Sequence, residues 1–379
     1  MDESANTPAE RIESDTEVKN LLNKEKDSSK TRRYGARSNA LDVAAGVDLK
    51  GRTALVTGTN SGIGIETART LCLCGAHVIM ANRNIVESEK LINELKREKV
   101  ATSCLFIYRH STKGTEPAPT VNIFCIAPEP DAEIDLLTVD LSSFQSINAA
   151  ANEYLSKNWP LHILILNAAV FAPSEKSTID GYERAFGVNY LGHFYLTYLL
   201  LPRIRESTPA RIVIVSSTSH NHTGINAALP TEEKLKRLMP PVDGSTNVYR
   251  LYAYSKLCCV LLAMKLHRME HSNGINSYVL HPGNMVATGI SRTFGLLGRI
   301  GNALTKPFTK TLQQAAATTI YCAVSEDVKN DSGKYYEGCW DDEKNLCAAL
   351  AHDEALQDAL WDKSLELIEQ YERSRTQQQ

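Results

Sequence analysis

Short apolar runs alternate with helix-length amphipathic stretches along most of the chain, beginning near Asp48. The runs are rich in Val, Ile and Leu and lie at 53–57, 76–81, 136–139, 163–166, 212–215 and 277–280. Apolar strands separated by helices are typical of a parallel sheet that helices cover on both faces. The pattern therefore predicts one doubly wound α/β domain, which we place at 46–371.

Both ends of the chain and one internal stretch depart from this alternation. Residues 1–45 and 372–379 are mostly charged or small and polar, so we expect a disordered arm and a disordered tail. A charged helix is predicted at 87–99 and the next strand near Asp135, whereas such connections usually need about 2–6 residues. We interpret 100–134 as an insertion, either a flap that binds a partner or a poorly ordered excursion.

Composition and charge exclude several classes of protein. The chain has 379 residues, with 41 Lys and Arg against 44 Asp and Glu, so it lacks the basic excess of a nucleic-acid binder. Its polar start and the lack of a long apolar run predict neither a signal peptide nor a transmembrane segment, so a cytoplasmic location is expected. The nine cysteines show no paired CxxC spacing, which predicts free thiols and no metal site.

A glycine-rich segment, TGTNSGIG at 57–64, joins the first predicted strand to a helix at 63–74. Gly58 allows a tight turn, Gly62 lets the backbone approach a pyrophosphate, and Gly64 lets the helix pack on the strand. The free N–H groups of a helix start attract phosphate. The segment predicts a Rossmann-type dinucleotide site, to which Asn60, Ser61 and Ile63 also contribute.

The TGxxxGxG spacing resembles the fingerprint of the short-chain dehydrogenase/reductase family. Further marks of that family follow in order over roughly 50–370: Asp140, Asn167, Asn189, Ser217, Tyr252 with Lys256, and Pro282 with Gly283. The resemblance implies a nicotinamide-dependent oxidoreductase, with retinoids and steroids as the leading substrate classes. It also implies that Asp140 holds the adenine amino group, that Asn167 lines the cofactor, and that Pro282, Gly283 and Thr288 close over the nicotinamide. A homodimer through the helices that carry Asn189 and Tyr252 is expected.

The predicted catalytic residues are Ser217, Asn189, Tyr252 and Lys256. Tyr252 and Lys256 are four positions apart in a helical segment, so their side chains share one face. A phenol is a poor base at neutral pH, and a neighbouring ammonium favours the phenolate. Ser217 follows the fifth strand and is expected to bind the substrate oxygen, with Ser216 as the competing candidate. The resemblance places Asn189 in a proton relay through a water molecule.

The choice between nicotinamide cofactors depends on the end of the second strand. An NAD site usually places a carboxylate there, whereas this chain has Asn82 and Arg83. Arg83 can pair with a 2′-phosphate, so NADP(H) is predicted, although an arginine that only points into water is the alternative. Asp140 could likewise serve only as a helix N-cap.

Two long segments, 218–250 and 284–310, are expected to flank the crevice. The second mixes apolar residues with glycines, as in a lid over a lipophilic ligand, or in an amphipathic helix at a membrane surface. The sequence therefore predicts an NADP-dependent enzyme that interconverts an alcohol and a carbonyl on a lipophilic substrate. The alternative is a non-catalytic NADP-binding adaptor with the same fold.

Overall fold

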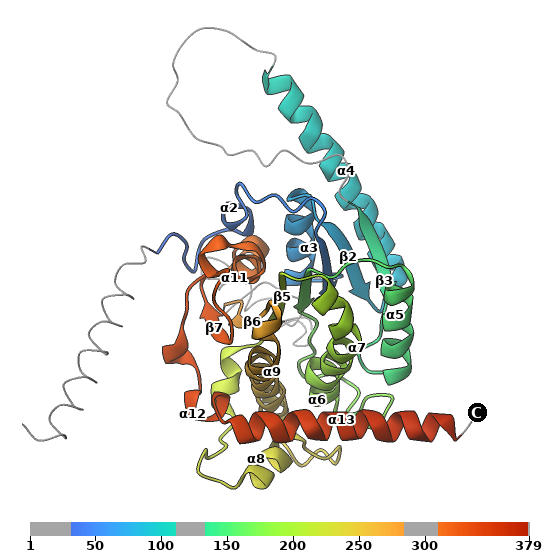
Figure 1. The fold of residues 1–379 in the computed structure, drawn as a ribbon, viewed down its shortest axis with the longest axis vertical. Helices are drawn as coiled ribbons and strands as arrows, with labels where there is room; N and C mark the ends of the chain where they lie inside the picture. The colour runs from blue at the N-terminus through green and yellow to red at the C-terminus, as the bar shows by residue number, and fades with distance from the viewer. Residues whose placement is uncertain (1–31, 111–132, 284–309, 378–379) are drawn as a thin grey trace, which may run out of the picture.

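A computed structural model describes residues 32–110, 133–283 and 310–377 (Figure 1). Its centre is a sheet of seven strands in the order β3-β2-β1-β4-β5-β6-β7, and every pairing is parallel. The strands are β1 (Thr53–Thr57), β2 (His77–Asn82), β3 (Ile134–Thr138), β4 (Ile163–Leu166), β5 (Ala210–Val215), β6 (Ile275–His281) and β7 (Lys334–Glu337). The predicted fold and all six predicted strands are confirmed. The short β7 was not predicted, because only its two central residues are buried.

Two apolar layers lie on opposite faces of the sheet. Successive residues of β1 alternate between them: Ala54 and Val56 face one layer and Leu55 the other. The first layer contains α2 (Ala40–Val43), α3 (Ile63–Leu73), α4 (Ile85–His110) and α11 (Leu312–Val324). The second contains α5 (Phe144–Ser156), α7 (Gly192–Glu206), α9 (Val248–Glu270) and α13 (Glu354–Thr376).

The other helical segments of the described ranges are short. They are α6 (Arg184–Phe186), the π-helix η1 (Gly187–Leu191), α8 (Thr231–Leu238), α12 (Ala348–Ala351), and the 3₁₀ turns η2 (Thr218–His222), η3 (His271–Asn273), η6 (Glu326–Val328) and η7 (Glu343–Asn345). None of the helices in the described ranges combines the length and the hydropathy that crossing a bilayer requires.

The boundaries of the domain are wider than the sequence predicts. Residues 32–45 are not a disordered arm: Ala40 and Val43 are buried, and the Tyr34 ring lies 6.1 Å from that of Tyr321. These small apolar segments are ordered because they meet α11, which is remote in sequence. At the other end α13 runs to Thr376, so most of the predicted tail is helical. Residues 1–31 and 378–379 lie outside the described residues.

The predicted helix at 87–99 is also too short. Helix α4 begins at Ile85 and continues to His110, into the predicted insertion, and residues 85–110 contain no glycine or proline that would end it. In Figure 1 its second half projects beyond the sheet. The rest of the predicted insertion, up to 132, lies outside the described residues.

The C-terminal helix α13 crosses α9 and the start of α7 (Figure 1). The Trp361 ring packs edge-on against Phe194 at 4.8 Å, and the hydroxyls of Tyr190 and Ser364 form a 2.8 Å hydrogen bond. This is part of the face to which the resemblance assigns a dimer contact. A homodimer stays a prediction, and it would need either a shift of α13 or a different surface.

Replacing Trp361 with alanine should lower the free energy of unfolding by about 3–5 kcal/mol, because the buried indole leaves a cavity. Denaturant unfolding followed by circular dichroism would measure this. Val86 is exposed, and the control variant Val86→Ala should change the same quantity by less than about 0.5 kcal/mol. A loss of similar size in both variants would contradict the packing described for α13.

Candidate active site

The turn between β1 and α3 has room for backbone only. A Cβ atom at Gly64 would lie 2.2 Å from the carbonyl oxygen of Gly58, and one at Gly58 would lie 2.8 Å from the Cα of Ala168. Gly62 has a φ of 59°, in the left-handed region that favours glycine. The three glycines therefore leave a groove of backbone N–H groups at the start of α3, which fits the pyrophosphate of a dinucleotide.

Asn82, at the end of β2, holds this turn in place. Its buried amide accepts a hydrogen bond from the Thr59 N–H at 2.7 Å and donates to the Thr59 hydroxyl at 2.7 Å. The Asn60 amide donates to the Asn84 carbonyl at 3.1 Å, so it supports the same turn, while Ser61 is exposed and Ile63 half-buried. From the sequence, Asn82 is expected only to stand in place of the carboxylate of an NAD site. A polar residue that ends an apolar strand is the signal that points to its larger role.

A cavity of about 660 Å³ opens beside the glycine turn, at the carboxyl edge of the sheet. Its walls come from the turn, from 167–174 after β4, from the end of β5, and from Tyr252, Lys256 and Pro282. Strands β1 and β4 are neighbours in the sheet, with β2 and β3 beyond β1 and with β5, β6 and β7 beyond β4. Doubly wound sheets bind ligands at such a point, where the strand order reverses. The predicted cofactor turn and the Tyr252–Lys256 pair thus meet in one place.

Helix α9 positions Tyr252 and Lys256 on one face. The Lys256 Nζ lies 5.5 Å from the centroid of the Tyr252 ring and donates to the Val215 carbonyl at 2.9 Å. The Lys256 side chain is buried, and the Tyr252 ring is held on another side by Phe171, edge-on at 5.1 Å. The sequence analysis does not single out Phe171, which lies in a segment without regular structure.

The two serines after β5 have different partners. Ser216 is buried, and its hydroxyl donates to the Lys256 carbonyl at 2.8 Å, so its proton is already used. Ser217 is half-buried and caps η2, where its hydroxyl donates to that of Ser219 at 3.1 Å. Ser216 rather than Ser217 contributes to the cavity wall. Ser217 nevertheless remains the candidate, because only its hydroxyl can exchange a weak local partner for a substrate oxygen.

Asn189 lies in the π-helix η1 and is buried. Its side-chain amide accepts from the Val170 N–H at 2.7 Å and donates to the Val170 carbonyl and the Ser255 hydroxyl, both at 3.0 Å. Its main-chain carbonyl accepts from the His193 ring at 3.0 Å and from the Cys259 thiol at 3.3 Å. The expected contact with backbone is present. The water relay stays a prediction.

His193 is a further residue that the sequence analysis misses. Because Nδ1 faces a carbonyl oxygen it must carry the proton, so Nε2 accepts from the Thr57 hydroxyl at 2.9 Å. The Thr57 oxygen in turn accepts from the N–H groups of Asn167 and Ala168 at 2.9 and 3.0 Å. His193 therefore connects the ends of β1 and β4 to the turn that holds Asn189. Its place one helical turn after Asn189 is the only signal in the sequence.

The buried His193 ring should make the free energy of unfolding fall as the pH becomes acidic. Burial, with a smaller contribution from the Lys256 ammonium, lowers the pKa of His193 from 6.5 to about 4. Between these values the unfolded chain takes up a proton that the folded chain does not, so stability should fall as the pH drops from 6.5 to 4, by at most about 3 kcal/mol. Urea unfolding across this range should show a smaller fall for His193→Asn. Equal falls would contradict the neutral buried ring.

Arg83 and Asp140 lie together beyond the ends of β2 and β3. The Arg83 guanidinium is 3.8 Å from one carboxylate oxygen of Asp140, and its side chain is 69% exposed. The other oxygen accepts from the Ser142 N–H and hydroxyl at 2.9 and 2.7 Å, while Ser143 forms the N-cap of α5. Asp140 is therefore not the helix cap. This ion pair is long and exposed, so the Arg83 side chain can turn toward a ligand.

The other predicted cofactor residues divide into three groups. The Asn167 amide donates to the Thr57 carbonyl at 2.9 Å, and Asn167 and Pro282 both line the cavity. Gly283 has a φ of 112° and lies beside Lys310, whose Nζ donates to the Pro282 carbonyl at 3.3 Å. Thr288 and the predicted lid, apart from Lys310, lie outside the described residues.

The parallel sheet and the glycine turn are those of the α/β domains that bind dinucleotides, and the cavity beside the turn contains Tyr252 and Lys256. A family model described as short chain dehydrogenase matches residues 52–118 and 123–229. The WW domain-containing oxidoreductase of Gallus gallus is 36% identical over 337 residues, which cover 89% of this chain and 72% of that protein. Retinol dehydrogenase 12 of Mus musculus is 33% identical over 324 residues, which cover 85% of this chain and 88% of that protein. The chain belongs to the short-chain dehydrogenase family.

Other comparisons agree with this assignment. The chloroplastic short-chain dehydrogenase TIC 32 A of Brassica napus is 35% identical, covering 89% of this chain and 94% of that protein. A putative NAD(P)-dependent gluconate 5-dehydrogenase from Beutenbergia cavernae, with bound NADP, is 19% identical with a TM-score of 0.53, over 76% of this chain and 95% of that one. It supports the fold alone.

Proposed function

We propose that this chain is an NADP(H)-dependent oxidoreductase that interconverts an alcohol and a carbonyl group on a lipophilic substrate, in the cytoplasm. The observation that carries the proposal is the Lys256 ammonium beside the Tyr252 ring, in the same cavity as the glycine turn. A non-catalytic adaptor would not need this arrangement. Oxidoreductase relatives, among them retinol dehydrogenase 12, support an enzyme.

The roles of the residues follow from their positions. A bound dinucleotide would supply or accept the hydride. Tyr252 donates its phenolic proton to the substrate oxygen when a carbonyl is reduced and accepts a proton when an alcohol is oxidised. The Lys256 ammonium stabilises the phenolate between these states. Ser217 donates a hydrogen bond to the same oxygen, and Asn189 holds the loop around Val170 that forms one wall.

The surroundings of Tyr252 favour an apolar substrate. Phe171, Ala172 and Pro173 line the cavity, and a second pocket of about 140 Å³ shares Ala172 and Pro173 with it. Its walls include Pro241, Val242, Val248 and Leu251. This lining is compatible with retinoids and steroids, the classes that the family resemblance implies, and these are the proposed substrates. Consumption of NADPH with a panel of retinals, ketosteroids and aliphatic aldehydes tests this, and turnover confined to short polar aldehydes would overturn it.

Arg83→Asp should shift the preference from NADP(H) toward NAD(H) by about tenfold or more. A carboxylate at this position repels a 2′-phosphate and accepts a hydrogen bond from a free ribose hydroxyl. The ratio of kcat/KM for the two cofactors measures the shift. Arg373→Asp, a change at an exposed arginine of α13, should leave the ratio unaltered. An unchanged ratio in Arg83→Asp would reject Arg83 as the selecting residue while leaving the oxidoreductase proposal intact.

A further inference from the structure

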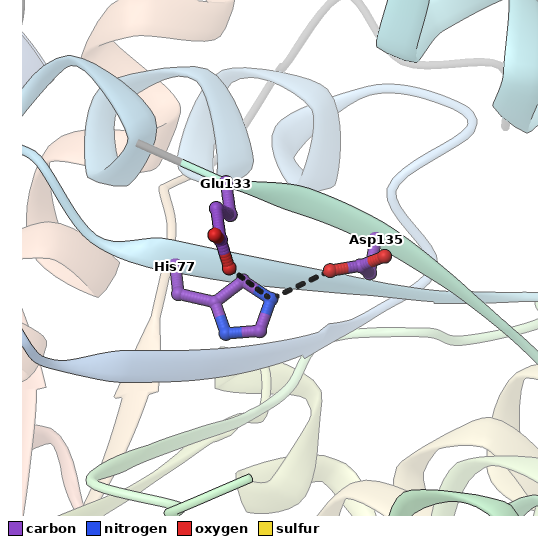
Figure 2. Close-up of side chains that lie close together, drawn as sticks. All are labelled: His77, Glu133 and Asp135. Carbon is purple, nitrogen blue, oxygen red and sulfur yellow. Dashed lines mark hydrogen bonds and ion pairs between the residues drawn. The ribbon is translucent and has the colours of Figure 1, made fainter. Parts of the chain in front are cut away.

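Three ligand-type side chains meet at the amino-terminal edge of the sheet, away from the active site (Figure 2). His77 is the first residue of β2, Asp135 is the second residue of β3, and Glu133 directly precedes β3. The two strands are paired in parallel with Ile79 opposite Asp135. Because side chains alternate along a strand, all three residues lie on one face of the sheet. Figure 2 shows the side chains pointing toward one another.

Both carboxylates approach the same imidazole nitrogen. The His77 Nε2 lies 2.7 Å from Oδ2 of Asp135 and 4.0 Å from Oε2 of Glu133, and the three atoms lie within 4.8 Å of one another. An imidazole N–H directed at Asp135 cannot at the same time be donated to Glu133. Within the described ranges, neither carboxylate pairs with a lysine or an arginine. Two carboxylates therefore converge on one imidazole nitrogen.

We propose that His77, Glu133 and Asp135 bind a divalent transition-metal ion of the zinc or cobalt type. Imidazole with carboxylates suits such ions better than magnesium or calcium, which prefer oxygen ligands. Zinc at about 2.0–2.2 Å from each ligand atom needs separations of about 3–3.5 Å, and the observed 2.7 and 4.0 Å lie on either side of that range. Small side-chain rotations close the difference.

The site is rigid on one side and open on the other. The His77 ring packs edge-on against Trp159 at 5.1 Å and its side chain is 14% exposed, whereas those of Glu133 and Asp135 are 74% and 44% exposed. Three protein ligands would leave at least one coordination position of the ion open to water. The ion would join β2 to β3, which is an edge strand of the sheet, and so stabilise the folded state.

Isothermal titration calorimetry of the EDTA-treated full-length protein with Co²⁺ or Zn²⁺ tests the proposal. We expect one saturable site, a higher melting temperature with metal, and at least tenfold weaker binding by His77→Gln and by the nearly isosteric Asp135→Asn. The control is His352→Gln, in an exposed pair with Glu343 at 3.4 Å, which should bind like the unchanged chain.

Three results would overturn the proposal. One is the absence of saturable binding, which would mean that His77, Glu133 and Asp135 form ion pairs and no metal site. Another is equal affinity in Asp135→Asn and the unchanged chain. The third is a thiolate-to-cobalt charge-transfer band that accounts for all of the bound metal, which would assign the ion to cysteines. None of these readouts depends on catalytic activity, so the test is independent of the proposed function.

Discussion

Replacing Tyr252 with phenylalanine should lower kcat by about 10²–10⁴-fold while leaving the affinity for NADPH nearly unchanged. The variant keeps the ring that packs against Phe171 and removes only the hydroxyl that exchanges a proton with the substrate. Steady-state turnover with the best carbonyl substrate of the panel measures kcat, and quenching of NADPH fluorescence measures affinity. The loss should appear in both reaction directions, because the same proton is donated in one and accepted in the other.

Tyr249 offers a matched control for this variant on the same helix. It lies three positions before Tyr252, its side chain is exposed, and the residue four positions later is Ala253 rather than a lysine. Tyr249→Phe should therefore turn over like the unchanged chain. Full activity in Tyr252→Phe, or equal losses in the two variants, would remove Tyr252 from the mechanism.

Gly64→Ala should weaken dinucleotide binding by at least about tenfold and destabilise the fold by about 1–3 kcal/mol. The added Cβ would lie 2.2 Å from the Gly58 carbonyl oxygen and 2.8 Å from the Asn167 amide nitrogen, so the turn and the end of β4 would both have to shift. NADPH fluorescence and thermal unfolding measure the two effects.

Gly35→Ala is the control for this change. A Cβ at Gly35 would meet only the flexible end of Arg32, at 3.9 Å, so binding and stability should both stay close to those of the unchanged chain. Normal NADPH affinity in Gly64→Ala would contradict the assignment of the glycine turn as the pyrophosphate site.

Much of the fold could be predicted because its signals are local. The strands β1 and β4 were predicted to the residue, since buried parallel strands are continuous apolar runs. The packing of 32–45 on α11 could not be predicted, because it depends on an apolar surface that forms only when distant segments meet. Helix α4, by contrast, continues past its predicted end because residues 85–110 contain no glycine or proline.

The site divides in the same way. Tyr252 and Lys256 lie on one helix, so their proximity follows from their spacing. The contacts of His193 with Thr57 and of Asn82 with Thr59 join residues that are far apart in the chain, and the local signals at His193 and Asn82 do not name these partners. The same holds for His77 and Asp135, which strand pairing brings together where the sequence analysis predicts no metal site.

Transfer of deuterium from NADPH labelled at the nicotinamide C4 position tests the central claim most directly. If the Tyr252 cavity carries out hydride transfer to a carbonyl, mass spectrometry should find the label on the carbinol carbon of the product alcohol. Tyr252→Phe should form this product far more slowly. Tight NADPH binding without label in any product, across retinals, ketosteroids and aliphatic aldehydes, would contradict the account and favour the adaptor.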